Sequence, residues 1–223
     1  MKTNIKIAVY LLSVIILFSC NISEKKKSDS KTINEQASLN AKDILGNSKY
    51  PAISYGGYRG NSRTLQPTLV ELKKDMKLLY ALGIRIIRTY NVQPHLPHAS
   101  NILKAIRELK KEDANFEMYV MLGAWIDCQN AWTNETPNHD IESLQNEGEI
   151  MRAVALANKY PDIVKVIAVG NEAMVRWATS YFVRPDVILK WVNHLQDLKR
   201  SGGLPRDLWI TSSDDFASWG GGD

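Results

Sequence analysis

The segment VKVIAVGNEAMVRW, residues 164–177, begins as an apolar strand, and its apolar run stops at Asn171 and Glu172. A carboxylate at the edge of a core costs free energy unless it is paired, hydrogen-bonded or used in chemistry. A positioned Glu is a common general acid or base. Glu172 is therefore the first candidate catalytic residue, and Asn171 beside it is a candidate binding residue.

Polar and aromatic side chains also follow the other apolar runs of the chain. These residues are Tyr55, Tyr58, Arg88, Tyr90, Trp125, Asp127, Asp214 and Asp215. Arg88 can orient a carboxylate or satisfy a carbonyl at a strand end, and we favour the first. Trp125 and, in the loop after Glu172, Trp177 suit either the wall of a cleft or core packing. Asp214 and Asp215 can supply a second carboxylate, although subsite or capping roles fit them better.

The elements that position these residues alternate regularly from residue 50 onward. Apolar runs predict strands within 52–60, 84–90, 116–126, 163–172 and 207–215. Amphipathic stretches predict helices within 67–83, 101–113, 147–160 and 185–203. Thr68 and Glu71 form a capping box at the start of the first helix. Residues 127–141 are expected to form a long polar loop.

The order strand–helix–strand predicts an α/β fold with parallel strands and right-handed crossovers. A doubly wound open sheet and a (β/α)8 TIM barrel both fit. No G-x-G-x-x-G or phosphate loop follows a strand, which disfavours the first. The polar strand ends would converge on one face of a barrel. Because a barrel needs roughly 250 residues, residues 49–223 are expected to form a partial barrel truncated to about its first five strands.

The first 48 residues differ in composition from the rest. Lys2 and Lys6 precede or flank a short apolar run, as in a signal peptide. The LFSC sequence resembles a bacterial lipoprotein signal, residues 1–19, cut before a lipid-bearing Cys20. An ordinary signal or an uncleaved anchor are the alternatives. The polar composition of residues 20–48 predicts a flexible tether. Together with the lipoprotein signal, it leads us to expect a protein of the bacterial cell envelope that is anchored to a membrane by lipid.

Charge and cysteine content exclude several classes of protein. The net charge is +4, and loss of residues 1–19 removes two lysines and leaves +2 without a basic stripe, so no nucleic-acid partner is expected. With Cys20 acylated, Cys128 has no disulfide partner. His95 and His98 are spaced across Pro97 without a third ligand nearby, and we interpret them as loop or subsite histidines. We predict a monomer without a metal or cofactor.

Three motifs resemble glycoside hydrolase family 17 across most of residues 52–223. AVGNEA is similar to the segment of that family that carries the acid/base Glu, ISYGG to its first strand, and IRTYN to its second. This chain departs from the pattern of the family at Asn91, where an Asp is more usual. The longer loops are similar to a bacterial branch of the family.

This resemblance implies a retaining hydrolase of β-1,3-glucan of the laminarin type. Glu172 would be the acid/base, Asn171 would bind the sugar 2-hydroxyl, and Tyr55 and Tyr90 would lie in the cleft. The nucleophile would be a Glu on a late strand beyond residue 223, so this chain alone is not expected to hydrolyse its substrate. A β-glucan transglycosylase with the same site, and a non-catalytic glycan-binding lipoprotein, remain open as alternatives.

Overall fold

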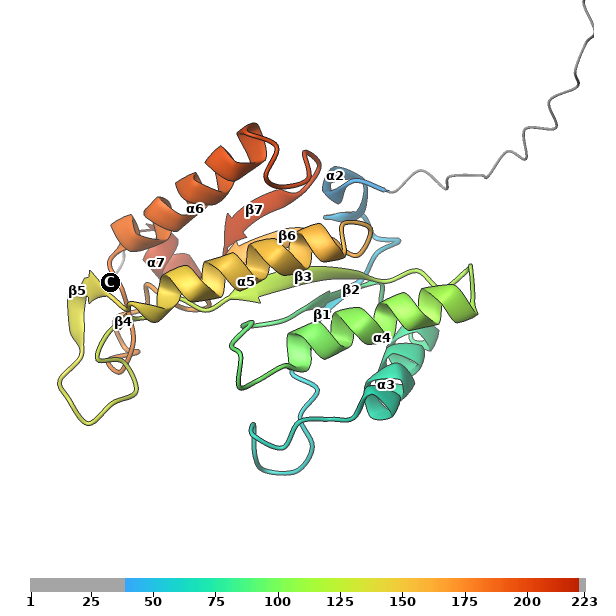
Figure 1. Ribbon diagram of the computed structural model, residues 1–223, viewed down its shortest axis with the longest axis horizontal. Helices are drawn as coiled ribbons and strands as arrows, with labels where there is room; N and C mark the ends of the chain where they lie inside the picture. The colour runs from blue at the N-terminus through green and yellow to red at the C-terminus, as the bar shows by residue number, and fades with distance from the viewer. Residues whose placement is uncertain (1–38, 221–223) are drawn as a thin grey trace, which may run out of the picture. The chain divides into compact units, whose positions relative to one another are not determined.

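The computed structural model describes residues 39–220, in which five parallel strands form one sheet of order β1-β2-β3-β6-β7 (Figure 1). The strands are β1 Ala52–Ser54, β2 Ile86–Arg88, β3 Tyr119–Ala124, β6 Val164–Val169 and β7 Trp209–Ser212. Every pairing along the sheet is parallel. The strand order therefore follows the chain from one edge of the sheet to the other.

Helices occupy the connections between these strands. They are α3 Leu69–Ala81, α4 His98–Glu112, α5 Gln145–Lys159 and α6 Pro185–Arg200, with the short α2 Ala41–Ile44 before the sheet and α7 Phe216–Gly220 after it. The predicted capping box is present, because Glu71 accepts the Thr68 N–H at 2.7 Å and Thr68 accepts the Glu71 N–H at 3.3 Å. None of the helices between residues 39 and 220 is long and apolar enough to cross a membrane.

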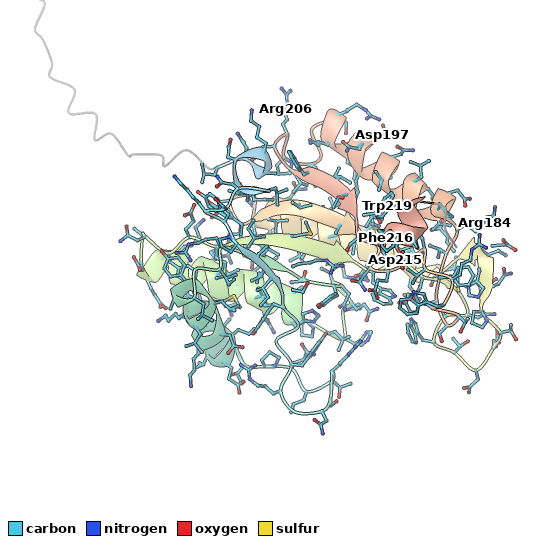
Figure 2. The ribbon with its side chains drawn as sticks, turned by 180° about the vertical axis from the view of Figure 1, so that it is seen from behind. Arg184, Asp197, Arg206, Asp215, Phe216 and Trp219 are labelled. Carbon is cyan, nitrogen blue, oxygen red and sulfur yellow. The ribbon has the colours of Figure 1, made fainter. Side chains whose placement is uncertain are left out.

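The unreversed strand order decides between the two predicted architectures. A doubly wound sheet changes direction at a switch point, whereas a sheet that grows only one way, with right-handed crossovers, places every helix on the same face. In Figure 1, α4 and α5 lie in front of the strands, and the reverse view in Figure 2 shows the strands on the near side. The α/β prediction is confirmed, and the arrangement matches part of a (β/α)8 barrel.

The main core lies between the sheet and these helices. Strand residues Ile87, Leu122 and Ile167 are fully buried in one hydrophobic cluster with Ile106 of α4 and Ala153 of α5. Since side chains alternate across a strand, the residues between them face the other side of the sheet. The carboxyl ends of all five strands point the same way, which sets the place of the candidate site.

The tether prediction is wrong at its C-terminal end. Helix α2 lies within residues 20–48, and its Ile44 is fully buried against Ile86 of β2 and Tyr119 of β3. The composition of this segment is polar, but Leu39, Leu45 and Tyr50 pack against the same cluster as Ile44 and help to hold this helical turn on the sheet. Most of the predicted tether, the predicted signal at 1–19 and Cys20 lie outside the described residues.

Two other local predictions also need correction. Residues 127–141 do not form a simple loop, because β4 Cys128–Gln129 and β5 Asn138–Glu142 pair as an antiparallel hairpin. His98 is not a loop histidine: it is the first residue of α4, fully buried, with its ring 5.4 Å from that of Tyr58. His95 lines a small cavity beside the main one described below.

Gly123 permits a close approach of β3 to the backbone that follows β2. A Cβ at this position would lie 2.4 Å from the carbonyl oxygen of Thr89 and 2.7 Å from Cα of Tyr90. The Gly123 N–H donates to Thr89 Oγ1 at 3.2 Å. The absence of a side chain here therefore sets the position of Tyr90 at the end of β2.

We predict that Gly123→Ala lowers the free energy of unfolding by about 1–3 kcal/mol, as overpacking of a core does, because the atoms in the way are backbone. Urea unfolding of the two proteins measures the difference. Gly220→Ala is the matched control, since a Cβ there meets no described atom within 4 Å. Equal stability of Gly123→Ala and wild type would contradict the close approach.

Candidate active site

A cavity of about 720 Å³ lies at the carboxyl ends of the strands. Its walls come from the segments after β1, β2, β3 and β6 and from the loop of the hairpin. The lining residues are Gly56, Tyr58, Arg63, Arg88, Tyr90, Asn91, Trp125, Trp132, Asn171, Glu172, Trp177 and Tyr181. A cavity at this end of a barrel sheet is the expected position of an active site.

The backbone turns sharply where β6 delivers Glu172 to this cavity. Gly170 has φ +77° and donates its N–H to the carbonyl of Ala124 at 2.8 Å, and Glu172 has φ +49° and donates to the carbonyl of Ser213 at 2.8 Å. A positive φ is unfavourable for a residue with a side chain, and residues with such a strained backbone cluster at functional sites. The turn is thus tied to the last residue of β3 and to the first residue after β7, the two strands that neighbour β6, and Glu172 is exposed to the cavity.

Asn171, which follows β6, is held by a cation on β2, two strands away in the sheet. Nη2 of Arg88 donates to Oδ1 of Asn171 at 2.5 Å, a charge-assisted hydrogen bond. The guanidinium lies 5.2 Å from the ring centroid of Tyr90. The partner of Arg88 is therefore an amide rather than the carboxylate or strand-end carbonyl expected from the sequence. This contact fixes the side-chain oxygen of Asn171 toward Arg88.

Aromatic rings form one wall of the cavity. The ring of Trp132 stacks on that of Tyr181, with centroids 5.0 Å apart and planes at 22°, and Tyr181 lies 5.2 Å from Trp125. Trp132 and Trp177 are 62% and 64% exposed, so their rings are accessible from the cavity. Exposed, rigid aromatic faces of this kind suit flat apolar surfaces of a ligand.

The indole of Trp125 is oriented by a buried carboxylate. Its Nε1–H donates to Oδ2 of Asp127 at 3.2 Å, and Asp127 is only 8% exposed. Burial raises the pKa of the Asp127 carboxyl above its ordinary value, against the opposing effect of this hydrogen bond. Asp127 therefore affects the cavity by fixing the orientation of the Trp125 indole.

The two aspartates after β7 have backbone partners. Asp214 accepts the N–H of Met174 at 3.0 Å, and burial raises the pKa of its carboxyl. Asp215 accepts the N–H of Ser218 at 2.8 Å at the start of α7, where it lies beside Phe216 and Trp219 (Figure 2), and this bond lowers its pKa. These contacts agree with the capping interpretation of the pair.

The structure brings together six of the seven residues predicted for the site within the fold. They are Arg88, Tyr90, Trp125, Asn171, Glu172 and Trp177. Tyr55 lies apart from this set, because its hydroxyl donates to Oδ2 of Asp75 in α3 at 2.5 Å. Burial and this bond to Asp75 raise the pKa of the phenol. The segment after β1 contributes Gly56 and Tyr58 to the cavity instead.

Arg63, in the segment before α3, lies in no recognisable motif and was given no role by the sequence. Trp132 and Tyr181 belong to the aromatic residues at strand ends and in the following loops, whose rings the sequence interpretation assigned to contacts with sugar. Of the residues described, no group of three or more His, Cys, Asp or Glu side chains is placed to hold a metal ion.

Comparison with known proteins gives an informative similarity to a solved structure. No family model and no curated protein matches the chain. A solved structure, that of an endo-laminarinase from Formosa Hel1_33_131, is similar at 73% sequence identity with a TM-score of 0.81. The similarity covers 83% of this chain and 47% of the other, so this chain spans less than half the length of that enzyme.

For the buried Asp127 and the capping Asp215 we predict effects of pH on folding stability that are opposite in sign. Asp127 has a raised pKa in the folded state, so the folded state holds its proton more tightly and stability falls as pH rises past the ordinary Asp value of about 3.9. We therefore expect wild type to lose stability relative to Asp127→Asn between acidic and neutral pH. Urea unfolding at several pH values measures this, and the Asn side chain keeps an oxygen for Trp125.

Asp215→Asn is the matched control for this measurement. The pKa of Asp215 is lowered in the folded state, so its ionised form adds stability that is lost as pH falls. Wild type should gain stability relative to Asp215→Asn as pH rises from strongly acidic values to the ordinary Asp value of about 3.9, and should keep that gain at higher pH. Curves of the same sign for both variants would contradict the difference in environment.

Proposed function

We propose that this chain carries the acid/base half of the active site of a retaining glycoside hydrolase that cleaves within β-1,3-glucan of the laminarin type. The observation that carries the proposal is the position of Asn171 and Glu172 on the wall of the cavity, in a chain 73% identical to an endo-laminarinase over the matched part. The AVGNEA motif supports assignment to glycoside hydrolase family 17.

In this mechanism Glu172 acts twice. It first donates its proton to the glycosidic oxygen while a second carboxylate attacks the anomeric carbon, which releases the leaving sugar and forms a glycosyl–enzyme ester. The Glu172 carboxylate then takes a proton from water as the water attacks the same carbon, which frees the second carboxylate and restores the configuration. In retaining enzymes the two carboxyl groups lie about 5–5.5 Å apart.

The second carboxylate is expected from the part of the barrel that these five strands do not include. Asp214 and Asp215 are poorly suited to the role because both bind backbone N–H groups. A Glu at the end of a later strand, beyond residue 223, would face Glu172 across the barrel mouth. The complete catalytic pair thus depends on closure of the barrel.

The other cavity residues have roles in binding. Asn171, held by Arg88, would bind the 2-hydroxyl of the sugar under attack, a contact that strengthens in the transition state. Tyr90, Trp125 and Trp177 would contact sugar rings. We further propose that a lipid on Cys20 attaches the protein to a membrane of the bacterial cell envelope, so that soluble glucan is met at the cell surface or in the periplasm.

Glu172→Gln in the complete barrel tests the assignment. Gln cannot donate or accept the proton, so we expect hydrolysis of laminarin to fall by a factor of about 10²–10⁴, the usual contribution of a general acid–base. Binding of a β-1,3-linked glucohexaose, measured by indole fluorescence, should change little. Glu147→Gln, an exposed position on α5, is the control and should keep full activity.

Azide separates the acid/base role from that of a nucleophile. With Glu172→Ala and an aryl β-glucoside that needs no proton on its leaving group, azide should attack the glycosyl–enzyme and give the β-glucosyl azide. An α-glucosyl azide would instead identify Glu172 as the nucleophile. Binding without turnover in the wild-type protein would favour the non-catalytic glycan-binding alternative, and lengthened oligosaccharide products would favour the transglycosylase.

A further inference from the structure

Helix α5 carries polar side chains where a barrel helix normally carries apolar ones. Asn146 and Glu149 are 1% and 2% exposed, next to the buried core residues Ile150 and Ala153. Arg152 continues the same stripe, since residues three apart share one face of a helix. A buried carboxylate and a buried amide destabilise a core unless their hydrogen bonds are made. The partners of these side chains therefore explain their presence.

One oxygen of Glu149 joins the ends of two strands. Oε1 accepts the N–H of Val92, after β2, at 2.6 Å and the N–H of Trp125, after β3, at 3.0 Å. Oε2 accepts from Nη2 of Arg152 at 2.8 Å, which balances the buried charge. Nε of Arg152 donates to the carbonyl of Val92 at 2.9 Å. Both backbone groups of Val92 are thus held by α5.

Asn146 holds a third peptide in the same way. Its Oδ1 accepts the N–H of Asp127 at 3.1 Å, and its Nδ2 donates to the carbonyl of Asp127 at 2.9 Å. The stripe Asn146–Glu149–Arg152 therefore binds the backbone after β2 and after β3. All three side chains meet backbone groups, so their effect does not depend on the side chains of the loops that they hold.

The segments bound by this stripe carry cavity walls. Tyr90 and Asn91 directly precede Val92, and Trp125 is itself bound by Glu149. Asn146, Glu149 and Arg152 are not among the described residues that line the cavity. Any effect of the stripe on a ligand must therefore pass through the position of the two strand ends.

We propose that Glu149, supported by Asn146 and Arg152, is a positioning residue that sets the distance between Tyr90–Asn91 and Trp125 and so the width of the sugar-binding cleft. The inference rests on the proposed function for the identity of the ligand. Its structural part, the joining of two strand ends by one carboxylate oxygen, stands on the hydrogen bonds alone.

Two variants of Glu149 separate positioning from charge. Glu149→Gln keeps an oxygen for both N–H groups, whereas Glu149→Ala leaves both without a partner. Ile150→Ala is the matched control: it is a buried neighbour on α5, and its replacement destabilises the core without removing a hydrogen bond to the strand ends. All proteins are compared as the full chain, at a temperature where each is folded.

Amide hydrogen exchange by NMR gives the first readout. The amides of Val92 and Trp125 should lose protection together in Glu149→Ala, keep it in Glu149→Gln, and keep their protection relative to global unfolding in Ile150→Ala. The second readout is binding of a β-1,3-linked glucohexaose. We expect Kd to rise about tenfold or more in Glu149→Ala, as misplacement of a binding group does, and to stay close to the wild-type value in the other two.

Two results would overturn the proposal. Equal weakening of binding in Glu149→Ala and Ile150→Ala would show that the helix only stabilises the fold. If Glu149→Ala and Glu149→Gln changed the amide protection and the Kd equally, the charge of Glu149, and not its shared oxygen, would hold the strand ends. Absence of hexaose binding in the wild-type chain would count against the proposed function, while the amide protection would still decide whether Glu149 joins the strand ends.

Discussion

Parallel pairing in chain order is the constraint on which the rest of this structure depends. Because each of the five strands lies beside the next one along the chain, every crossover returns on the same side, and the helices gather on one face of the sheet. The same constraint brings all five carboxyl ends to one edge. The order of the strands therefore brings residues as distant in sequence as Tyr58, Arg88 and Glu172 together around one cavity.

Local pattern made the strands and helices predictable. The apolar run at 163–172 is long enough to be recognised alone, and the capping box of Thr68 and Glu71 marks the start of α3 to the residue. The candidate acid/base could also be found, because a Glu that ends an apolar strand contradicts the pattern around it. These features depend on a few neighbouring residues, so the sequence itself contains the information.

The features that escaped prediction depend on distant partners. Tyr55 points to Asp75 because a carboxylate on α3 lies within reach, which no local pattern records. The hairpin of β4 and β5 contains few apolar residues, and its base is held by Glu142, which accepts the indole N–H of Trp191 in α6 at 2.6 Å. The burial of Ile44 and His98 likewise results from packing between elements. In α5, Asn146 and Glu149 interrupt the apolar face, and this interruption was the available signal.

The left-handed backbone at Glu172 has a consequence for how this position can vary. Gly and Asn adopt such a conformation more readily than Glu, by an amount on the order of 1 kcal/mol for Gly. Random replacement followed by selection for folding alone would drift toward those residues, whereas selection for catalysis would hold Glu in place. The residue found at position 172 in a relative therefore indicates which selection has acted on it. Gly or Asn there would indicate a protein that has kept the fold and lost the catalytic activity.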